Sequence, residues 1–456
     1  MKEKVTSAFT NLKSALNKGH DRSVKAKKNI FASFIIKGCN IAISLVLVPL
    51  TIHYVNPTQY GIWLTLSSII GWFAFFDIGF GNGLRNKFAE AIARNDHQLA
   101  RIYLSTTYAI LGIIIVCLLA IFLVINPFLN WTSILNTPSS MAAELSTLAI
   151  LVFVFFCLQF ILQLITTIIT ANQQPAKASF FNFLGSLFSL TVIFILTKTT
   201  SGSLINLALS LGFTPVLVLT ASSIWFYTHE YKKYAPSIKF VHFSYARGLM
   251  SLGLKFFIIQ IATVVLYETS NLIIAQLFGP AQVTPYNVAY KYFGIIPMVM
   301  GIIMTPFWSA FTEAWVKQDI AWIKQTMKRL QILWVGLTVL TVLMLLLSGL
   351  IYRLWVGKGL AIPVSISVAM ASYVIVNAWN GIYSQFVNGV GKIKLQLYIA
   401  LAGTLVNIPL AIYLGKHVGI YGVVLSTTII SIMGAIASPI QYYKIINNKA
   451  RGIWAA

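Results

Sequence analysis

The chain has 456 residues, of which 58% are hydrophobic and 9% are charged, and its mean hydropathy is +0.80. This composition excludes an ordinary soluble domain and indicates a membrane protein. The 33 Lys and Arg residues outnumber the 10 Asp and Glu residues, which gives a formal net charge of +23. These bases fall in short connectors between apolar runs, which disfavours the single basic face of a nucleic-acid-binding protein.

Apolar windows of at least ~18 residues predict membrane-spanning helices. A basic leader, residues 1–29, precedes the first window and lacks the cleavage pattern of a removable signal peptide, so we expect a cytoplasmic segment that touches anionic lipid. The twelve windows are centred on residues 30–52, 61–83, 102–125, 146–172, 178–197, 204–228, 250–278, 285–312, 330–351, 361–387, 395–414 and 419–443.

The bases also predict the orientation of the chain. With the N-terminus in the cytoplasm, 26 of the 33 Lys and Arg residues fall on inner segments and four on outer segments. The positive-inside rule predicts this bias, so we expect both termini in the cytoplasm.

The two halves of the sequence repeat each other. A shift of 223 residues superposes the first half on the second without a gap, and equivalent spans then cross the membrane in the same direction, as in a parallel repeat. We therefore expect two six-helix bundles, 30–228 and 250–443, joined by a cytoplasmic linker at 229–249 and followed by a tail at 444–456. The matched pairs are Pro57 with Pro280, Gln59 with Gln282, Glu90 with Glu313, Arg94 with Lys317 and Asp96 with Asp319.

The stretch Phe76–Ala91, FDIGFGNGLRNKFAEA, places an acid at the end of a charge-free run that begins at Tyr54. Asp77 is therefore expected inside the membrane, where an ionisable residue is costly and marks a functional site. The repeat sets Asp77 opposite Met300, so this acid is present in one half alone, whereas the recurring charges around Glu90 favour a structural role. The glycines of the stretch allow a kink or close helix packing.

The fourth and tenth spans each carry a stripe of uncharged hydrogen-bonding side chains on one helical face. Contacts between neighbouring helices explain such residues singly. The match between two stripes instead favours the polar wall of a shared cavity, because neutral amides and hydroxyls both donate and accept, as sugar hydroxyls do. A shift of 214 residues pairs Gln159 with Tyr373, Gln163 with Asn377, Thr166 with Asn380, Thr170 with Ser384 and Gln174 with Asn388.

Several charges fall within the spans. Lys37 and Asp77 both lie ~10 Å deep on the inner side and could pair, and Glu268 and Lys291 reach comparable depths in the outer half. Lys255 lies close to the cytoplasmic face. Snorkelling of the lysines and structural ion pairs are the alternatives to function. In the functional interpretation, the lysines hold a diphosphate or an acidic sugar, and the carboxylates exchange a proton or a sodium ion.

Arg85 lies at the cytoplasmic end of the second span, where it anchors the helix and would meet an incoming headgroup first. The six histidines lie at span ends or in loops without metal-ligand spacing, and no P-loop, nucleophile elbow or hydrolase carboxylate pair is present in the sequence. We therefore expect no catalytic residue, no metal site, no cofactor and no nucleic-acid partner.

Four passages resemble one family, the Wzx-type oligosaccharide flippases of the multidrug/oligosaccharidyl-lipid/polysaccharide exporter superfamily. They are YGIWLTLSSIIGWFAFFDIGFGNGLRNKFAEA from Tyr60, PFWSAFTEAWVKQD from Pro306, NGVGKIKLQ from Asn388 and GIYGVVLST from Gly419. The resemblance implies an all-α fold of two bundles around a V-shaped, MATE-like cavity in a bacterial inner membrane. Alternating access would carry an undecaprenyl-diphosphate-linked oligosaccharide to the outer leaflet for O-antigen, capsule or a similar polymer. A polysaccharide polymerase and a chain-length regulator are the implied partners.

In this hypothesis the sugars bind the two polar stripes while Lys37, Lys255 or Lys291 holds the diphosphate. An ion gradient acting through Asp77 or Glu268, or removal of the product by polymerisation, supplies the energy. Three alternatives stay open: a multidrug cation antiporter, a lipid II flippase of the same superfamily, and a membrane-embedded glycosyltransferase or ligase. The antiporter is disfavoured because only two of the ten acids lie well inside spans.

Overall fold

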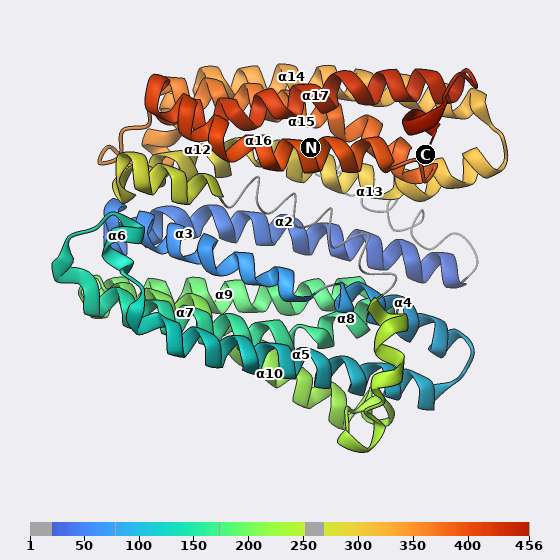
Figure 1. The fold of residues 1–456 in the computed structure, drawn as a ribbon, viewed down its shortest axis with the longest axis horizontal. Coiled ribbons are helices and arrows are strands. Elements are labelled where there is room, and N and C mark those ends of the chain that lie inside the picture. Colours follow the sequence, from blue (N-terminus) through green and yellow to red (C-terminus); the bar gives the residue numbers. More distant parts are fainter. Residues whose placement is uncertain (1–20, 78, 173, 251–268, 456) are drawn as a thin grey trace, which may run out of the picture.

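The computed structural model describes residues 21–77, 79–172, 174–250 and 269–455, and every regular element in these ranges is helical (Figure 1). The α-helices are α2 Asp21–Val55, α3 Pro57–Gly71, α4 Phe80–Ala93, α5 His97–Ile125, α6 Trp131–Leu135, α7 Ala142–Leu162, α8 Leu164–Ala171, α9 Pro175–Thr199, α10 Leu204–Thr228, α12 Val283–Phe293, α13 Ile295–Val316, α14 Ile320–Trp355, α15 Val364–Gly389, α16 Lys394–Val418 and α17 Ile420–Ile446. The short 3-10 helices are η1 Trp72–Asp77, η2 Asn126–Phe128, η3 Ser139–Met141, η4 Lys232–Tyr234, η5 Ile238–Phe240, η6 Phe243–Tyr245, η7 Pro280–Gln282 and η8 Gly452–Ala455.

Eight helical segments in the described ranges are long and apolar enough to cross a membrane, so the chain is a multi-pass membrane protein. They coincide with eight of the twelve predicted windows. The window at 250–278 falls largely outside the described residues, and the window at 361–387 forms α15, whose polar stripe lowers its hydropathy.

The other two windows, 61–83 and 285–312, are helical but interrupted, and the first interruption is the kink that its glycines allow. α3 ends at Gly71, and a 3-10 turn then leads to Gly79, whose φ of 79° is a left-handed conformation that stops a helix. In the second half the break is milder and falls at Gly294, between α12 and α13. Gly71 and Gly294 are equivalent in the 223-residue repeat, so the two breaks belong to the repeated architecture.

The same helix cap occurs at equivalent positions of the two halves. The carboxylate of Asp96 accepts a hydrogen bond from Leu99 N at the start of α5, and Asp319 accepts one from Trp322 N at the start of α14, each over 2.9 Å. The residue before each aspartate has a φ of 58°. A carboxylate at the N-cap satisfies free backbone N–H groups and favours the helix dipole, which explains why this acid recurs.

Glu90 near the end of α4 supports the structural interpretation of the recurring charges. Its carboxylate lies 3.0 Å from Lys87 Nζ and 2.7 Å from a guanidinium nitrogen of Arg94. The hydrogen bond from Lys87 and the charges of both bases hold the pKa of Glu90 below its usual range. Both pairs join residues three or four positions apart at the end of α4, so they stabilise this helix end.

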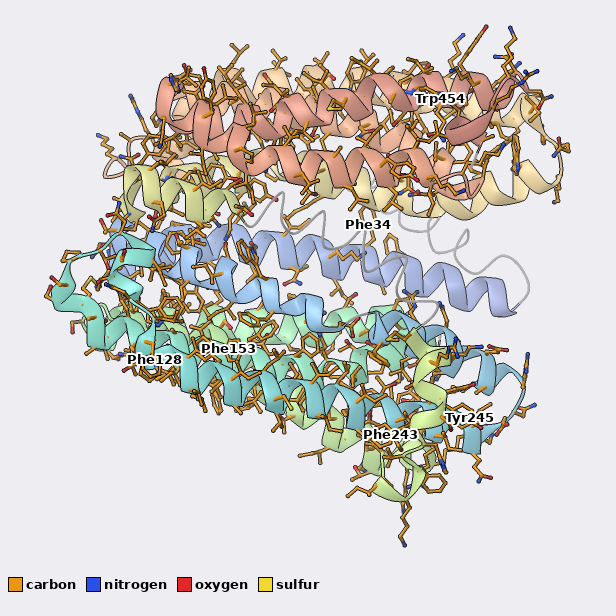
Figure 2. All side chains as sticks on the ribbon, in the orientation of Figure 1. Phe34, Phe128, Phe153, Phe243, Tyr245 and Trp454 are labelled. Atoms are coloured by element: carbon orange, nitrogen blue, oxygen red, sulfur yellow. The ribbon has the colours of Figure 1, made fainter. Side chains whose placement is uncertain are left out.

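The helices form two groups in Figure 1, α2–α10 in blue to green and α12–α17 in yellow to red. One buried apolar cluster lies within residues 62–249 and includes Phe153, which Figure 2 labels. The ring of Phe153 stacks on that of Phe122 with centroids 4.0 Å apart. The second cluster joins α12–α17 to Val48 of α2 and Tyr60 of α3. The two groups therefore share apolar packing through α2 and α3.

Direct contacts between the groups gather at the end of the molecule that holds Pro57 and Pro280, on the left in Figure 1. There, Thr284 Oγ1 donates to Pro57 O over 2.6 Å. The backbone of Gly61 approaches Pro280 so closely that a Cβ atom at Gly61 would lie 1.9 Å from Pro280 O. We call this region the Pro57 end and the opposite one, which holds Arg94 and the linker, the Arg94 end.

Side chains from both groups also form a clamp at the Pro57 end, which we call the Asn136–Gln276 clamp. Asn136 Nδ2 lies 3.2 Å from Ala275 O and 3.3 Å from Gln276 O, and Gln276 Nε2 donates to Ser133 O over 2.8 Å and to Ile134 O. Each amide thus bonds backbone carbonyls of the other group. These contacts hold the two groups together at this end.

Candidate functional site

Asp77 lies at the break between α3 and α4. Its Oδ1 accepts a hydrogen bond of 2.9 Å from Gly81 N, at the N-terminus of α4. A Cβ atom at Gly81 would lie 3.3 Å from both carboxylate oxygens, so the glycine permits this close approach. The negative charge also faces the positive end of the α4 dipole. The fold therefore gives Asp77 a structural task that the sequence did not indicate.

Asp77 also lines a polar cavity of about 290 Å³, which we call the Asp77 cavity. One wall comes from the break and from Arg85 on α4, and the other comes from the junction of α7 and α8. This cavity joins Asp77 and Arg85 to the lower part of the first polar stripe, a grouping that the sequence did not predict. Its lining residues are Asp77, Gly81, Arg85, Phe160, Gln163, Leu164, Thr166, Thr167 and Thr170.

The cavity presents hydrogen-bonding atoms with unused capacity. Thr166 Oγ1 donates to Gln163 O and Thr170 Oγ1 donates to Thr166 O, each over 2.7 Å, which leaves both hydroxyl oxygens able to accept. Within the described part of the chain, the exposed side chains of Gln163 and Arg85 have no hydrogen-bond or ion-pair partner. The site can therefore bind a neutral polyhydroxyl group and one negative charge.

The remaining residues of the two stripes make contacts within their own half. Gln159 Nε2 donates to Gly212 O of α10 over 3.1 Å, one turn away from the Asp77 cavity. On α15, Asn377 Nδ2 lies 3.3 Å from the hydroxyl of Tyr373, and Asn380 Oδ1 accepts from Ser438 of α17 over 3.0 Å. Ser384 and Asn388 are half-buried near the end of α15. A cavity wall shared by both stripes is not visible among the described residues.

Lys37 lies in a different cavity, of about 630 Å³, which we call the Lys37 cavity. It is lined by α2 and α9 of the first group and by α13 of the second, so both halves contribute to it. Among the residues that the structure describes, Lys37 and Asp77 form no ion pair, and each lines its own cavity. The lining residues are Lys37, Asn40, Ile41, Ser44, Ser186, Pro297, Met298 and Gly301.

The other predicted charges are less informative. Lys291 is half-buried on α12 and forms no ion pair with another described residue. Lys255 and Glu268 lie outside the described residues, so their predicted roles and the predicted proximity of Glu268 to Lys291 stay predictions.

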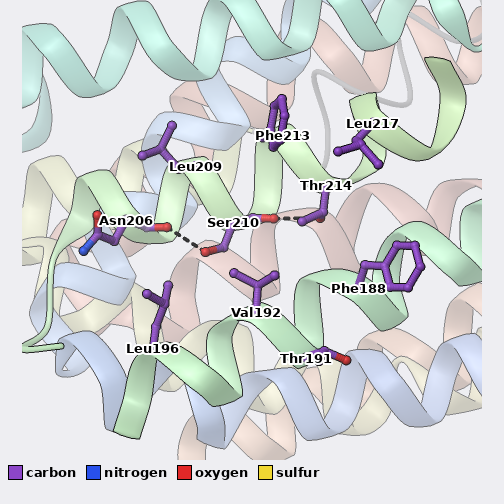
Figure 3. Close-up of a pocket in the computed structure, with 10 residues that line it drawn as sticks. All are labelled: Phe188, Thr191, Val192, Leu196, Asn206, Leu209, Ser210, Phe213, Thr214 and Leu217. Carbon is purple, nitrogen blue, oxygen red and sulfur yellow. Dashed lines mark hydrogen bonds between the residues drawn. The ribbon is translucent and has the colours of Figure 1, made fainter. Parts of the chain in front are cut away.

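An apolar groove of about 430 Å³ lies between α9 and α10 (Figure 3). Its hydroxyls already donate to backbone carbonyls, Ser210 to Asn206 O over 2.8 Å and Thr214 to Ser210 O over 2.7 Å. Phe188 and Phe213 expose their rings at its edges. Such a surface suits lipid chains, and it offers little to a polar substrate.

Sequence reasoning missed two sets of polar lining residues. Thr167 follows Thr166 in the Asp77 cavity, where the helix break at Gln163 turns it toward the same space. Asn40 and Ser44 lie three and seven residues after Lys37, which is the spacing of one face of a helix. That spacing could have revealed Asn40 and Ser44. Thr167 faces its cavity only because of the helix break at Gln163, which the residue pattern does not predict.

The fold is that of the MATE transporters of the MOP superfamily. A MATE-family multidrug resistance transporter in an inward-facing conformation superposes with a TM-score of 0.72 and 12% identity, over 92% of this chain and 100% of its own. An outward-facing conformation of a MATE-family transporter gives a TM-score of 0.66 and 14% identity over 93% and 96%. At these identities the likeness concerns the fold alone.

The sequence profile of the family described as polysaccharide biosynthesis protein matches residues 26–310, more than half of the chain, and the chain belongs to this family. A Yersinia pseudotuberculosis protein named for O-antigen export is 21% identical over 74% of this chain and 76% of its own. A Salmonella typhi protein named as an O-antigen transporter is 21% identical over 90% and 94%.

Proposed function

We propose that the protein is a flippase that moves an undecaprenyl-diphosphate-linked oligosaccharide from the inner to the outer leaflet of a bacterial inner membrane, with both termini in the cytoplasm. The observation that carries the proposal is the Asp77 cavity, which sets amide and hydroxyl groups beside one free guanidinium. Family membership and the names of the relatives support a glycan as cargo.

The Asp77 cavity is the proposed binding site for the sugar head. The hydroxyl oxygens of Thr166 and Thr170 accept hydrogen bonds from the sugar, and the amide of Gln163 both donates and accepts. The buried ring of Phe160 forms an apolar part of the lining. Arg85 adds a positive charge at the edge of the site.

The Lys37 cavity is the proposed site of the diphosphate. Lys37 has no carboxylate partner among the described residues, and Asn40 and Ser44 offer further hydrogen bonds along the same face of α2. Because α13 of the second half closes the cavity, a diphosphate bound there contacts both halves. The lipid tail stays in the bilayer during transport.

Alternating access is the proposed mechanism. Among the described residues, the hydrogen bonds Thr284–Pro57, Asn136–Ala275 and Gln276–Ser133 join the halves at the Pro57 end, which supports a conformation that opens at the Arg94 end. Exchange of a proton or a sodium ion at Asp77, or polymerisation of the product outside, drives the cycle. A polymerase and a chain-length regulator act on the product downstream.

Complementation with a transport readout tests this proposal. In a strain that lacks the gene, the wild-type chain is expected to restore the surface polysaccharide, and purified protein in vesicles is expected to expose a lipid-linked oligosaccharide to an external glycosidase. Arg85→Gln should reduce both signals, whereas Asn86→Ala on the same helix should not. Normal surface polysaccharide and unchanged flipping in Arg85→Gln would show that the Arg85 guanidinium does not take part in cargo binding.

A multidrug cation antiporter is the second candidate function, because the Asp77 carboxylate in a polar cavity also suits a cationic drug. A drug-sensitivity assay on the deletion strain separates the two functions. The flippase requires unchanged drug sensitivity together with a loss of surface polysaccharide, and the antiporter requires the reverse.

A further inference from the structure

The linker between the halves exposes apolar side chains that the protein does not cover. Ile238 on η5 is 92% exposed, and Phe243 on η6 is 57% exposed. Figure 2 shows Phe243 and Tyr245 on the short turns beside α5 at the Arg94 end of the molecule. Exposed apolar side chains become informative where they lie together on a fixed segment beside bases, because such a surface marks a site of contact with a membrane or a partner.

The linker is fixed against α5 by several contacts. Ser237 N donates to Ser105 Oγ over 3.1 Å, and His242 N donates to Thr106 Oγ1 over 3.0 Å. Arg101 Nε donates to Ala235 O over 2.9 Å. The exposure of Ile238 therefore belongs to an ordered segment that is held on both sides.

These contacts set the depth of the linker. Ser105 and Thr106 are buried hydroxyl residues three and four positions inside the apolar window that begins at residue 102, which is about 5 Å at 1.5 Å per residue. A segment bonded to them lies at the boundary between headgroups and acyl chains. Ile238 and Phe243 then reach acyl chains from the cytoplasmic side.

The charges of the linker match an anionic surface. Lys232, Lys233, Lys239 and Arg247 are all exposed, and the acid at this site, Glu230, is 3.0 Å from Lys177 of α9. Bases held near a bilayer attract anionic lipid, and apolar side chains inserted beside them strengthen the attachment.

We propose that residues 237–247 form an interfacial strap that binds anionic phospholipid of the inner leaflet, with Ile238 and Phe243 inserted among acyl chains and the surrounding bases on the headgroups. The strap would hold the start of the second half at a fixed depth relative to α5. This inference does not depend on which cargo the protein moves.

Site-directed spin labelling of the full chain in nanodiscs tests the strap. Labels are placed at Ile238→Cys and Phe243→Cys in a chain with Cys39→Ser, Cys117→Ser and Cys157→Ala, and a control label at Gln98→Cys occupies the exposed start of α5. In nanodiscs that contain phosphatidylglycerol, both linker labels should be more accessible to oxygen than to a water-soluble nickel complex, and the Gln98 label should show the reverse order.

The lipid preference is tested in the same preparation. Replacing phosphatidylglycerol with phosphatidylcholine, or combining Lys232→Gln, Lys233→Gln and Lys239→Gln, should raise nickel accessibility at position 238 several-fold. Labels at 238 and 243 as accessible to nickel as the label at 98 would overturn the insertion, and insertion independent of lipid charge would overturn the anionic preference. Labels exposed in nanodiscs but protected in native membranes would identify a protein partner and overturn the lipid proposal.

Discussion

Thr284 Oγ1 donates to the carbonyl oxygen of Pro57 over 2.6 Å, and the 223-residue repeat turns this pair of positions into Gly61 and Pro280, which also meet. The repeat therefore produces two equivalent contacts. In one, the Thr284 hydroxyl bonds Pro57, and in the other, the Gly61 backbone packs directly against Pro280 because glycine has no side chain. At the Pro57 end, α3 therefore crosses η7 and the start of α12 in close contact.

A methyl group at Gly61 should weaken the crossing. The Cβ atom of Gly61→Ala would lie 1.9 Å from Pro280 O, an overlap with backbone that no rotamer change relieves. Overpacking of this kind costs typically about 1–3 kcal/mol, so the thermal midpoint of the purified protein should fall. Gly112→Ala on α5 is the control, because its Cβ meets nothing within 4 Å. Equal midpoints for the two variants would contradict the close crossing.

The hydroxyl at Thr284 should matter separately. Thr284→Val keeps the shape of the side chain but removes the donor to Pro57 O, and a lost buried hydrogen bond costs about 1 kcal/mol. Thr284→Ser retains the donor and should lie closer to the wild type in thermal unfolding. If Thr284→Val is as stable as the wild type while Thr284→Ser is destabilised, then Thr284 stabilises the protein through packing and not through its hydrogen bond.

Two substitutions at Asp77 should distinguish a role in stability from a role in transport. Asp77→Asn keeps an oxygen that accepts from Gly81 N, so the thermal midpoint should change little, whereas Asp77→Ala loses the cap at a cost of about 1 kcal/mol. If the charge takes part in transport, both variants should lose surface polysaccharide. An asparagine variant with full export would restrict Asp77 to capping α4.

Thr167 lines the Asp77 cavity, a position that the sequence did not reveal. Thr167→Val removes a hydroxyl from the Asp77 cavity while it conserves volume, and it should lower flipping of the lipid-linked oligosaccharide several-fold at unchanged expression. Thr191→Val makes the same change in the apolar groove between α9 and α10 and should leave flipping intact. Equal rates for both variants would exclude Thr167 from the sugar site.

Weakening the Asn136–Gln276 clamp should shift the balance between conformations. Gln276→Ala removes donors to Ser133 O and Ile134 O, and about 1 kcal/mol corresponds to a roughly fivefold change in the ratio of conformers. Spin labels at the repeat-equivalent, exposed positions Gln98 and Ala321 should then report a larger population with a short distance at the Arg94 end.

Gln318→Ala is the control for this shift. The amide of Gln318 donates to Trp315 O within one half, so its removal leaves the contacts between halves unchanged. An identical distance distribution in the Gln276→Ala and wild-type proteins would show that the clamp does not stabilise the open Arg94 end.

Much of the fold could be predicted because it depends on apolar windows and on an internal repeat, and both can be read from the sequence. Apolar windows gave the spans, and the shift of 223 residues gave the repeat, whose caps at Asp96 and Asp319 have the same geometry. Both signals are local, since a window or a cap needs only its own residues. The predicted domain boundaries and the cytoplasmic placement of the termini stay predictions.

The composition of the candidate site was harder to predict because it depends on where a helix stops. Gly79 could equally have packed against a neighbour, as Gly83 does, where a Cβ atom would lie 2.0 Å from Leu249 O. The left-handed turn at Gly79 brings Asp77 and Arg85 to the α7–α8 junction. Periodicity likewise placed Gln159 and Asn380 on polar faces, but it could not tell that neighbouring helices satisfy them.

The unequal pair at the crossing also has a consequence for assembly. Two copies of the second half would set Thr284 against Pro280, where the backbone is too close for any side chain at the Gly61 position. Two copies of the first half would leave Pro57 O facing a glycine that has no hydroxyl to offer. The Thr284 hydroxyl and the bare backbone of Gly61 therefore complement each other only when one half meets the other.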